Sequence, residues 1–174
     1  LLQEKIGRLN QQAQSDALTG LANRRAMQDT LSLWQDADKA FAIVFMDIDH
    51  FKRVNDTFGH GVGDETLRAI AELMKQNSRS NDLPCRVGGE EFVLLLPNSS
   101  LRAATDVAER LRASIEAANI DTVGHITVSL GVALWSPGGD SVSAVLEKAD
   151  QLMYQAKQNG RNRVMAEESS VVTS

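Results

Sequence analysis

Two carboxylates stand at the end of an apolar run in this sequence. The run covers residues 41–46, and Asp47 and Asp49 follow it with one residue between them. Side chains two residues apart on a strand point to the same side. Such a pair suits Mg²⁺, which takes one or two protein carboxylates and completes its octahedron with water and substrate phosphates. Acidic residues also end strands as solvated caps, and the pair alone leaves both interpretations open.

A second acidic pair, Glu90 and Glu91, follows two adjacent glycines. Apolar stretches at 83–87 and 92–96 flank this segment, so Gly88-Gly89 indicates a hairpin turn in which both glycines take positive φ. Glycines let a metal or a phosphate approach the backbone, although acidic residues on a turn also serve solubility. If this hairpin pairs with the first strand, the carboxylates converge on one ion and form a phosphoryl-transfer site.

The spacing of apolar residues predicts the elements that position these carboxylates. The unbroken run at 41–46 predicts a strand buried on both faces, and alternation over 126–134 predicts a strand with one buried face. The last helix is expected to end near Gly160 and to lead into an edge strand over 162–165. Helical periodicity marks four segments, at 24–34, 67–74, 104–115 and 142–156.

This order of elements predicts a mixed α/β domain of the α+β type, with helices flanking a largely antiparallel central sheet. We expect the domain to cover residues 15–166. Apolar residues spaced four, three and four apart predict a linker helix over 1–14, either the stub of a two-helix coiled coil or a single amphipathic helix packed on the domain. Residues 167–174 are expected to be a disordered tail.

Composition excludes several classes of protein. The 174 residues are 43% hydrophobic and 24% charged, as in a soluble globular domain. No apolar run approaches the roughly 20 residues that span a bilayer, so we expect no membrane contact by this fragment. The net charge of −5 argues against nucleic acid as a partner. The chain begins at Leu1 without Met, which suggests a piece of a longer protein.

Metal-binding cysteines and histidines are not indicated. Cys85 is the single cysteine, so there is no internal disulfide, and a reducing, cytoplasmic compartment fits. We expect it to be a small buried residue rather than a reactive thiol. The three histidines have no paired ligand spacing, which argues against zinc.

Residues 88–92, Gly-Gly-Glu-Glu-Phe, resemble the Gly-Gly-[Asp/Glu]-Glu-Phe signature that names the diguanylate cyclase, or GGDEF, domain family. Further segments resemble the family's other motifs, in order, over about residues 16–164. They are Asp16-x-Leu18-Thr19-Gly20-Leu21-x-Asn23-Arg24-Arg25, Asp47-x-Asp49-x-Phe51-Lys52-x-x-Asn55-Asp56, Gly59-His60-x-x-Gly63-Asp64, Ser129-Leu130-Gly131-Val132-Ala133, and Ala149-Asp150 with Tyr154-x-Ala156-Lys157-x-x-Gly160-Arg161-Asn162.

The resemblance implies a fold akin to nucleotidyl cyclases and polymerase palms, and it assigns roles. Asp47, the backbone carbonyl of Ile48 and Glu90 would hold Mg²⁺, or Mn²⁺ in its place. Glu90, Glu91 or a metal-bound water would accept the proton of the attacking 3′-hydroxyl. Lys52 would both contact the substrate and take part in catalysis.

The same resemblance implies a substrate site for GTP. Asn55 and Asp64 would hydrogen-bond the guanine edge, and Phe51, in the same motif as Asn55, would also contribute to substrate binding. Three cations would hold the triphosphate. They are Lys52, Lys157 and Arg161.

Residue type alone favours plainer roles for some of these positions. Asn55 and Asp64 could be helix caps, and Lys157 and Arg161 could be cations placed at a helix end by its dipole. By type, the phenylalanines at three of these sites belong to the core. They are Phe51, Phe58 and Phe92.

A further motif, Arg79-x-x-Asp82, is separated from Gly88 by five residues. It resembles the family's inhibitory site for the product. An arginine can stack on guanine and donate to its edge, and an aspartate can accept from ring nitrogens. Arg110 would complete this site. The plain alternative is an ion pair within a loop.

Together these features predict a diguanylate cyclase. Two GTP molecules, one per subunit of a homodimer, would condense into cyclic di-GMP and two pyrophosphates, under control of an upstream sensor domain that could also carry a membrane anchor. The alternative is a non-catalytic cyclic di-GMP receptor that uses Arg79 and Asp82. A phosphodiesterase would need a larger metal site than the sequence provides.

Overall fold

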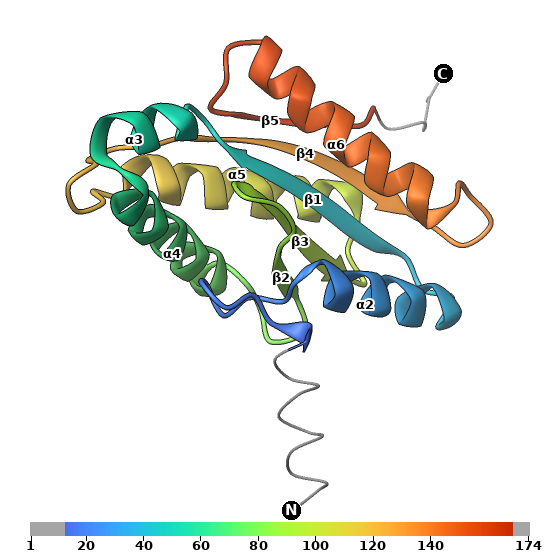
Figure 1. Ribbon diagram of the computed structural model, residues 1–174. Helices are drawn as coiled ribbons and strands as arrows, with labels where there is room; N and C mark the ends of the chain where they lie inside the picture. The colour runs from blue at the N-terminus through green and yellow to red at the C-terminus, as the bar shows by residue number, and fades with distance from the viewer. Residues whose placement is uncertain (1–12, 169–174) are drawn as a thin grey trace, which may run out of the picture.

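A five-stranded sheet lies at the centre of the computed structural model, which describes residues 13–168 (Figure 1). The strands are β1 (Phe41–Ile48), β2 (Leu83–Arg86), β3 (Glu91–Pro97), β4 (Val128–Trp135) and β5 (Arg163–Ala166). Their spatial order is β2-β3-β1-β4-β5. Only β5 runs parallel to its neighbour, β4, while the other pairings are antiparallel. The predicted fold class, a largely antiparallel mixed sheet, is confirmed.

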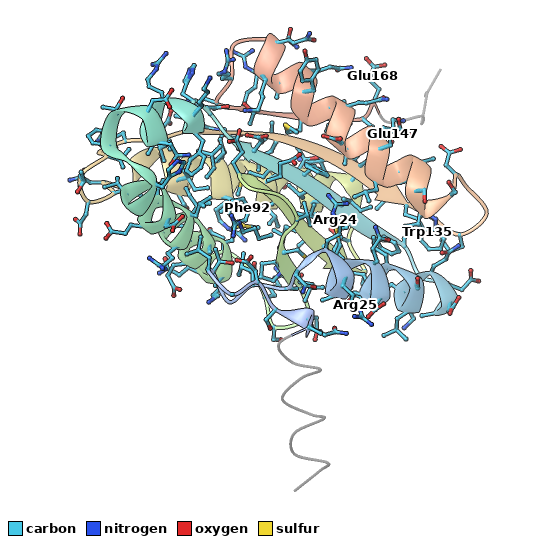
Figure 2. The ribbon with its side chains drawn as sticks, in the orientation of Figure 1. Arg24, Arg25, Phe92, Trp135, Glu147 and Glu168 are labelled. Atoms are coloured by element: carbon cyan, nitrogen blue, oxygen red, sulfur yellow. The ribbon has the colours of Figure 1, made fainter. Side chains whose placement is uncertain are left out.

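Helices cover both faces of this sheet, because the side chains of β1 alternate between two cores. Even-numbered residues of β1 pack with α4 and α5, and odd-numbered residues pack with α2 and α6. Phe92 and Trp135 lie among these packed side chains (Figure 2). The helices of the described chain are α2 (Arg24–Asp36), α3 (Phe51–Phe58), α4 (His60–Gln76), α5 (Leu101–Ala117) and α6 (Val142–Gln158).

Helix α3 was not predicted, because it is only eight residues long and buries only two of them, Phe51 and Val54. The expectation that Phe58 belongs to the core is wrong. Phe58 ends α3 and is 42% exposed, whereas Phe51 and Phe92 are buried as expected.

Strand β4 is buried on both faces rather than one, which corrects the prediction from its alternation. The positions between its large apolar residues carry small ones, Ser129, Gly131 and Ala133. A Cβ on Gly131 would lie 2.1 Å from the carbonyl oxygen of Ala149. The small residues therefore let α6 approach the strand backbone directly.

The predicted terminal segments fall largely outside the described residues. Most of the predicted linker helix lies outside the described residues, as do residues 169–174. Glu167 was expected in a disordered tail, but its carboxylate accepts a hydrogen bond from Leu134 N at 2.7 Å and pairs with Lys148 at 2.9 Å. Within residues 13–168, no helix has the length and apolar character needed to cross a bilayer.

The close approach of α6 to β4 gives a stability prediction. Gly131→Ala should lower the free energy of unfolding by about 1–3 kcal/mol, because α6 must move away from the new methyl group. Gly61→Ala is the matched control, since a Cβ there meets nothing within 4 Å. Urea denaturation followed by circular dichroism measures both. Equal stability of the two variants would show that the sheet does not require a glycine at position 131.

Candidate functional site

The end of β1 places Asp47 beside the signature hairpin. Asp47 and Glu91 are opposite each other in the β1–β3 ladder, and Ile48 N donates to the Glu90 carbonyl at 3.4 Å. The prediction that the two strands pair and bring the acidic pairs together is thus confirmed. Asp47, Glu90 and Glu91 line one open groove of about 710 Å³, whose other wall is helix α6.

Lys157, in the last turn of α6, reaches across to the end of β1. Its Nζ lies 3.1 Å from Asp47 Oδ1, 3.5 Å from Asp49 Oδ1 and 3.5 Å from the Ile48 carbonyl oxygen. The ammonium therefore faces three oxygens at the strand end, and the two aspartates do point to the same side, as alternation predicts. Two of these oxygens belong to groups that the family resemblance assigns to a metal.

The environment of Asp47 opposes its negative charge. Burial raises the pKa of Asp47 from 3.8 to about 7, with Glu90 adding to the rise and Lys157 opposing it. Asp47 Oδ1 is buried and has no hydrogen bond, since the contact with Lys157 does not have hydrogen-bond geometry. A buried carboxylate oxygen without a hydrogen bond is unfavourable unless a cation meets it.

These features fit a divalent cation. Asp47 supplies an oxygen without a hydrogen bond, the Ile48 carbonyl lies beside it, and Glu90 faces the same groove. Residues 13–168 contain no cluster of three or more His, Cys, Asp or Glu side chains able to hold a metal by themselves. A set of two carboxylates and one carbonyl is what Mg²⁺ uses when substrate phosphates complete its shell.

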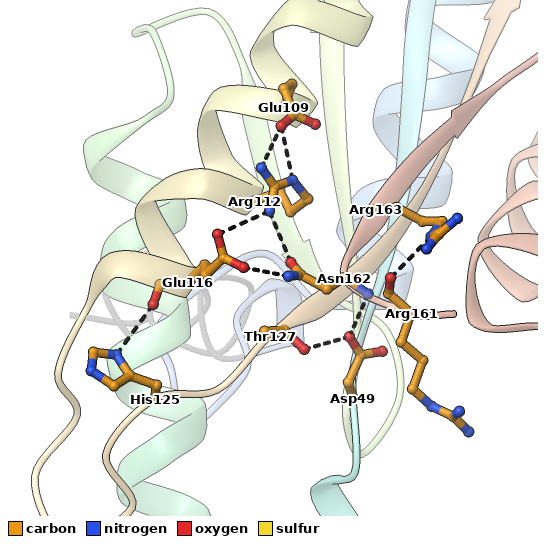
Figure 3. A network of polar contacts seen from close by, with 9 residues as sticks. All are labelled: Asp49, Glu109, Arg112, Glu116, His125, Thr127, Arg161, Asn162 and Arg163. Carbon is orange, nitrogen blue, oxygen red and sulfur yellow. Dashed lines mark hydrogen bonds and ion pairs between the residues drawn. The ribbon is translucent and has the colours of Figure 1, made fainter. Parts of the chain in front are cut away.

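Asp49 differs from Asp47, although both are aspartates on the same side. It is 2% exposed and accepts hydrogen bonds from Thr127 Oγ1 and Ser129 Oγ, both at 2.7 Å, and from Asn162 N at 3.0 Å. Its oxygens are therefore satisfied by the protein (Figure 3). Asp49 holds β1, β4 and the turn after α6 together, a role that the sequence did not reveal.

Glu91 lies in a negatively charged part of the groove. Burial raises its pKa, and the charges of Asp47 and Asp150 raise it further, while Arg24 and Lys157 oppose them. Asp150, on α6, lines the same groove, and burial raises its pKa too. A carboxylate with a raised pKa is better suited to hold a proton near neutral pH.

The signature hairpin differs from the prediction in its backbone. Gly88 and Gly89 do not adopt positive φ, so the expected reason for the glycines is wrong. At Gly88 a Cβ would lie 2.6 Å from Glu91 Oε1. This glycine makes room for the Glu91 carboxylate beside the turn.

Arg86 holds the signature hairpin in place, a role that was not predicted from the sequence. Its Nη2 and Nε donate to the Gly89 carbonyl oxygen at 2.8 and 3.2 Å, and its Nη1 lies 3.1 Å from Asp16 Oδ1. Burial tends to raise the pKa of Asp16, but hydrogen bonds from Thr19 and Arg86 outweigh it and lower that pKa. The position of Arg86, two residues before the signature, was the available signal.

The residues predicted to read guanine lie on α3 and α4 and do not line the groove. Asn55 Oδ1 is only 2.0 Å from a Cβ built on Gly63, and the Phe51 ring is 3.4 Å from it. Gly63 therefore keeps space for the Asn55 side chain, next to the exposed Asp64. Both residues lie inside helices, so neither is a cap. Phe51 is buried beneath them.

The three predicted phosphate-binding cations differ in their positions relative to the groove. Lys157 lines the groove, whereas Lys52 is exposed on α3 and Arg161 is exposed in the turn after α6. Neither Lys52 nor Arg161 lines the groove.

The Arg79-x-x-Asp82 segment lies at a separate pocket of about 460 Å³. Arg79, Asp82 and Arg110 all line it, at the end of β3 remote from the signature turn. Asp82 Oδ2 accepts from Arg79 N at 2.8 Å, and no ion pair joins the two side chains in the described chain. The alternative of a simple loop ion pair is therefore wrong.

Cys85 matches its expected passive role. It is fully buried on β2, and burial raises the pKa of its thiol to about 12. A thiol with such a pKa is inert near neutral pH.

Comparisons with known proteins agree with this geometry. The family model described as "Diguanylate cyclase, GGDEF domain" matches residues 13–163. The response regulator PleD of Caulobacter vibrioides is 45% identical in an alignment of length 164 that covers 88% of this chain and 36% of PleD. The chain thus spans about a third of the length of that relative.

Two solved structures are similar to this chain over most of its length. The coiled coil and GGDEF domain of DgcB from Caulobacter crescentus, in complex with c-di-GMP, has a TM-score of 0.90 and 34% identity, covering 95% of this chain and 92% of that one. The active GGEEF domain of a diguanylate cyclase from Vibrio cholerae has a TM-score of 0.79 and 32% identity, covering 86% and 99%. Like this chain, the latter has glutamate at the third signature position.

The raised pKa of Asp47 predicts a pH dependence of stability. A carboxyl group whose pKa is raised on folding contributes stability below its unfolded value of 3.8, and this contribution is lost as the pH rises through about 7. In EDTA, the unfolding free energy of the unmutated protein should therefore fall between about pH 5 and pH 8, relative to Asp47→Asn, by on the order of 1–2 kcal/mol. Urea titrations at each pH measure it. Parallel profiles for the two proteins would contradict the raised pKa.

Proposed function

The chain belongs to the diguanylate cyclase family of GGDEF domains, and from this premise we propose that it condenses two GTP molecules into cyclic di-GMP with release of two pyrophosphates. The observation that carries the proposal is the groove lined by Asp47, Glu90, Glu91 and Lys157, in which the buried Asp47 Oδ1 has no hydrogen bond and lies 3.1 Å from the Lys157 ammonium. This groove has the acidic and cationic groups that a metal-assisted phosphoryl transfer requires.

Asp47, the Ile48 carbonyl and Glu90 would hold Mg²⁺ or Mn²⁺. When bound, the metal would neutralise charge on the triphosphate as the α-phosphorus is attacked. Lys157 faces the same oxygens and lies at the groove wall, so it can donate to phosphate oxygens there. Lys52 and Arg161 would add positive charge from α3 and from the turn after α6.

Asn55 and Asp64 would bind the guanine edge. The space that Gly63 leaves for Asn55 supports this assignment, because it keeps an amide and a carboxylate side by side on adjoining helices. An amide and a carboxylate together can accept and donate in the pattern of guanine's Watson–Crick edge. Phe51 would support Asn55 from below.

Glu91 is the protein carboxylate that we favour as acceptor of the 3′-hydroxyl proton. Its raised pKa is caused first by burial and then by Asp47 and Asp150. The attacking hydroxyl must belong to a second GTP, since one groove holds one nucleotide. Two domains must therefore face each other in a homodimer, so that each hydroxyl lies in line with the other nucleotide's phosphorus. Residues upstream of the domain, in a linker helix and sensor, would control that pairing in the cytoplasm.

Removal of either proposed metal ligand should abolish turnover. Asp47→Ala and Glu90→Gln should lower the rate of cyclic di-GMP formation from GTP and Mg²⁺ by on the order of a hundredfold or more, because the carboxylate charge is lost. Glu72→Gln, on the exposed side of α4, is the control and should retain full activity. Chromatography of the products measures the rate, and circular dichroism checks the fold. Near-normal turnover in Glu90→Gln would refute the metal assignment.

A second nucleotide site is proposed at the pocket of Arg79, Asp82 and Arg110. Product bound there would inhibit without competing with GTP, because the pocket is separate from the groove. Asp82 already orders the loop through its bond to Arg79 N, which leaves the guanidinium of Arg79 available to the ligand.

Arg79→Ala should raise the concentration of cyclic di-GMP that halves activity by at least about tenfold. The reason is the loss of charge-assisted hydrogen bonds, each worth about 1.5–3 kcal/mol. Basal turnover should be unchanged, and inhibition should not depend on GTP concentration. Arg102→Ala, an exposed arginine on α5 outside the pocket, is the control. Superimposable inhibition curves for the unmutated protein and Arg79→Ala would contradict this site, while binding of cyclic di-GMP without any turnover would identify a receptor instead.

A further inference from the structure

The turn that follows α6 has an unfavourable backbone. Arg161 and Asn162 have φ values of 63° and 46°, in the left-handed region. For most residues other than glycine this conformation costs roughly 1–2 kcal/mol, and asparagine adopts it more readily than arginine. Two such residues in succession persist only where the surroundings hold them.

Asn162 is the residue that the surroundings hold. Its backbone N donates to Asp49 Oδ2 at 3.0 Å, its Oδ1 accepts from Arg112 Nη1 at 2.9 Å, and its Nδ2 donates to Glu116 Oε2. Figure 3 shows these contacts converging on Asn162 from α5 and from the end of β1. The amide group and the backbone N–H of this one residue are therefore all engaged.

The partners of Asn162 are themselves fixed. Arg112 is held on α5 by Glu109 at 2.5 Å and by Glu116 at 3.4 Å, and its side chain is only 16% exposed. Asp49 is buried and bonded to β4. The turn is thus attached to two rigid elements that are far from it in the sequence.

Arg161 is held only through its backbone. Its N donates to the Ala156 carbonyl at 2.9 Å, and its carbonyl oxygen accepts from Arg163 Nε at 3.1 Å. Its guanidinium makes no hydrogen bond or ion pair with any residue in 13–168, and in Figure 3 it extends away from Arg163. The direction of the Arg161 side chain therefore depends on the conformation of the turn.

We propose that Asn162 and Arg112 are positioning residues that hold Arg161 in the direction from which its guanidinium meets the triphosphate of GTP. The inference rests on the proposed function, in which Arg161 contacts phosphate. Without the bonds of Asn162, the turn can relax to the right-handed or extended region, which moves the Arg161 Cβ. A phosphate contact by a guanidinium is sensitive to such movement, because its donors form a planar fork.

Asn162→Gly tests the proposal directly. Glycine accepts the positive φ but removes the side-chain bonds to Arg112 and Glu116. We expect the affinity for a GTP analogue with an α,β-methylene bridge, measured by calorimetry in Mg²⁺, to fall about tenfold, and KM for GTP to rise similarly while kcat changes less than about threefold. Arg112→Gln should show a similar loss.

Two matched controls separate positioning from general damage. Asn159→Gly alters the same turn at a residue whose side chain makes no hydrogen bond to the described residues, and Arg102→Gln removes an exposed arginine from α5. Both should keep normal affinity for the analogue. Equal losses in the controls and in the test variants would overturn the proposal.

A double-mutant cycle shows whether Asn162 acts through Arg161. In an Arg161→Ala background, Asn162→Gly should weaken binding by less than about twofold further, because no guanidinium is left to position. A full tenfold loss in both backgrounds would show that Asn162 acts elsewhere and would refute this inference alone. Unchanged affinity in Arg161→Ala itself would refute the phosphate role of Arg161, and with it the inference.

Discussion

The contact of Lys157 with the two aspartates at the end of β1 is the interaction on which the site depends. Ionised carboxylates at the end of a buried strand are costly unless a cation meets them. The cation arrives from the last turn of α6, so this part of α6 must lie close to the sheet. Gly131 permits that approach by leaving no Cβ between β4 and the helix backbone. The packing of the core and the charge of the groove are therefore linked through one helix.

Within this arrangement, identical side chains have different uses because their neighbours differ. Asp49 receives hydrogen bonds from Thr127, Ser129 and Asn162, and these bonds make it part of the scaffold. Asp47, two residues earlier, has a buried oxygen without a hydrogen bond and a raised pKa. The oxygens of Asp49 are thus occupied by hydrogen bonds, whereas the buried oxygen of Asp47 is met by a cation, the Lys157 ammonium at 3.1 Å.

The sequence predicted those features that depend on local spacing. Apolar periodicity located β1, the hairpin and helix α6, and the signature with its neighbouring motifs indicated the family. It missed α3, whose eight residues bury too few apolar side chains to show a period. It also missed Asp49, Arg86 and Asn162 as structural centres, because each has a partner that lies 70 or more residues away. Such contacts follow from the completed fold, and spacing along the chain carries no trace of them. The roles assigned by resemblance to Asn55, Asp64 and Arg79 remain predictions.

Two turns border the candidate site, the signature hairpin and the turn after α6, and a different arginine holds each of them. Arg86 binds the Gly89 carbonyl of the signature hairpin and pairs with Asp16, at the start of the domain. Arg112 binds Asn162 from α5. The ion pair between Arg86 and Asp16 is largely shielded from solvent. If Asp16 moved alone, the Arg86 guanidinium would lose its carboxylate partner, which is costly for a shielded charge. If Arg86 followed Asp16, it would shift the Gly89 carbonyl as well. The segment where the chain enters the domain is thus mechanically connected to the hairpin that carries Glu90 and Glu91, through a single side chain.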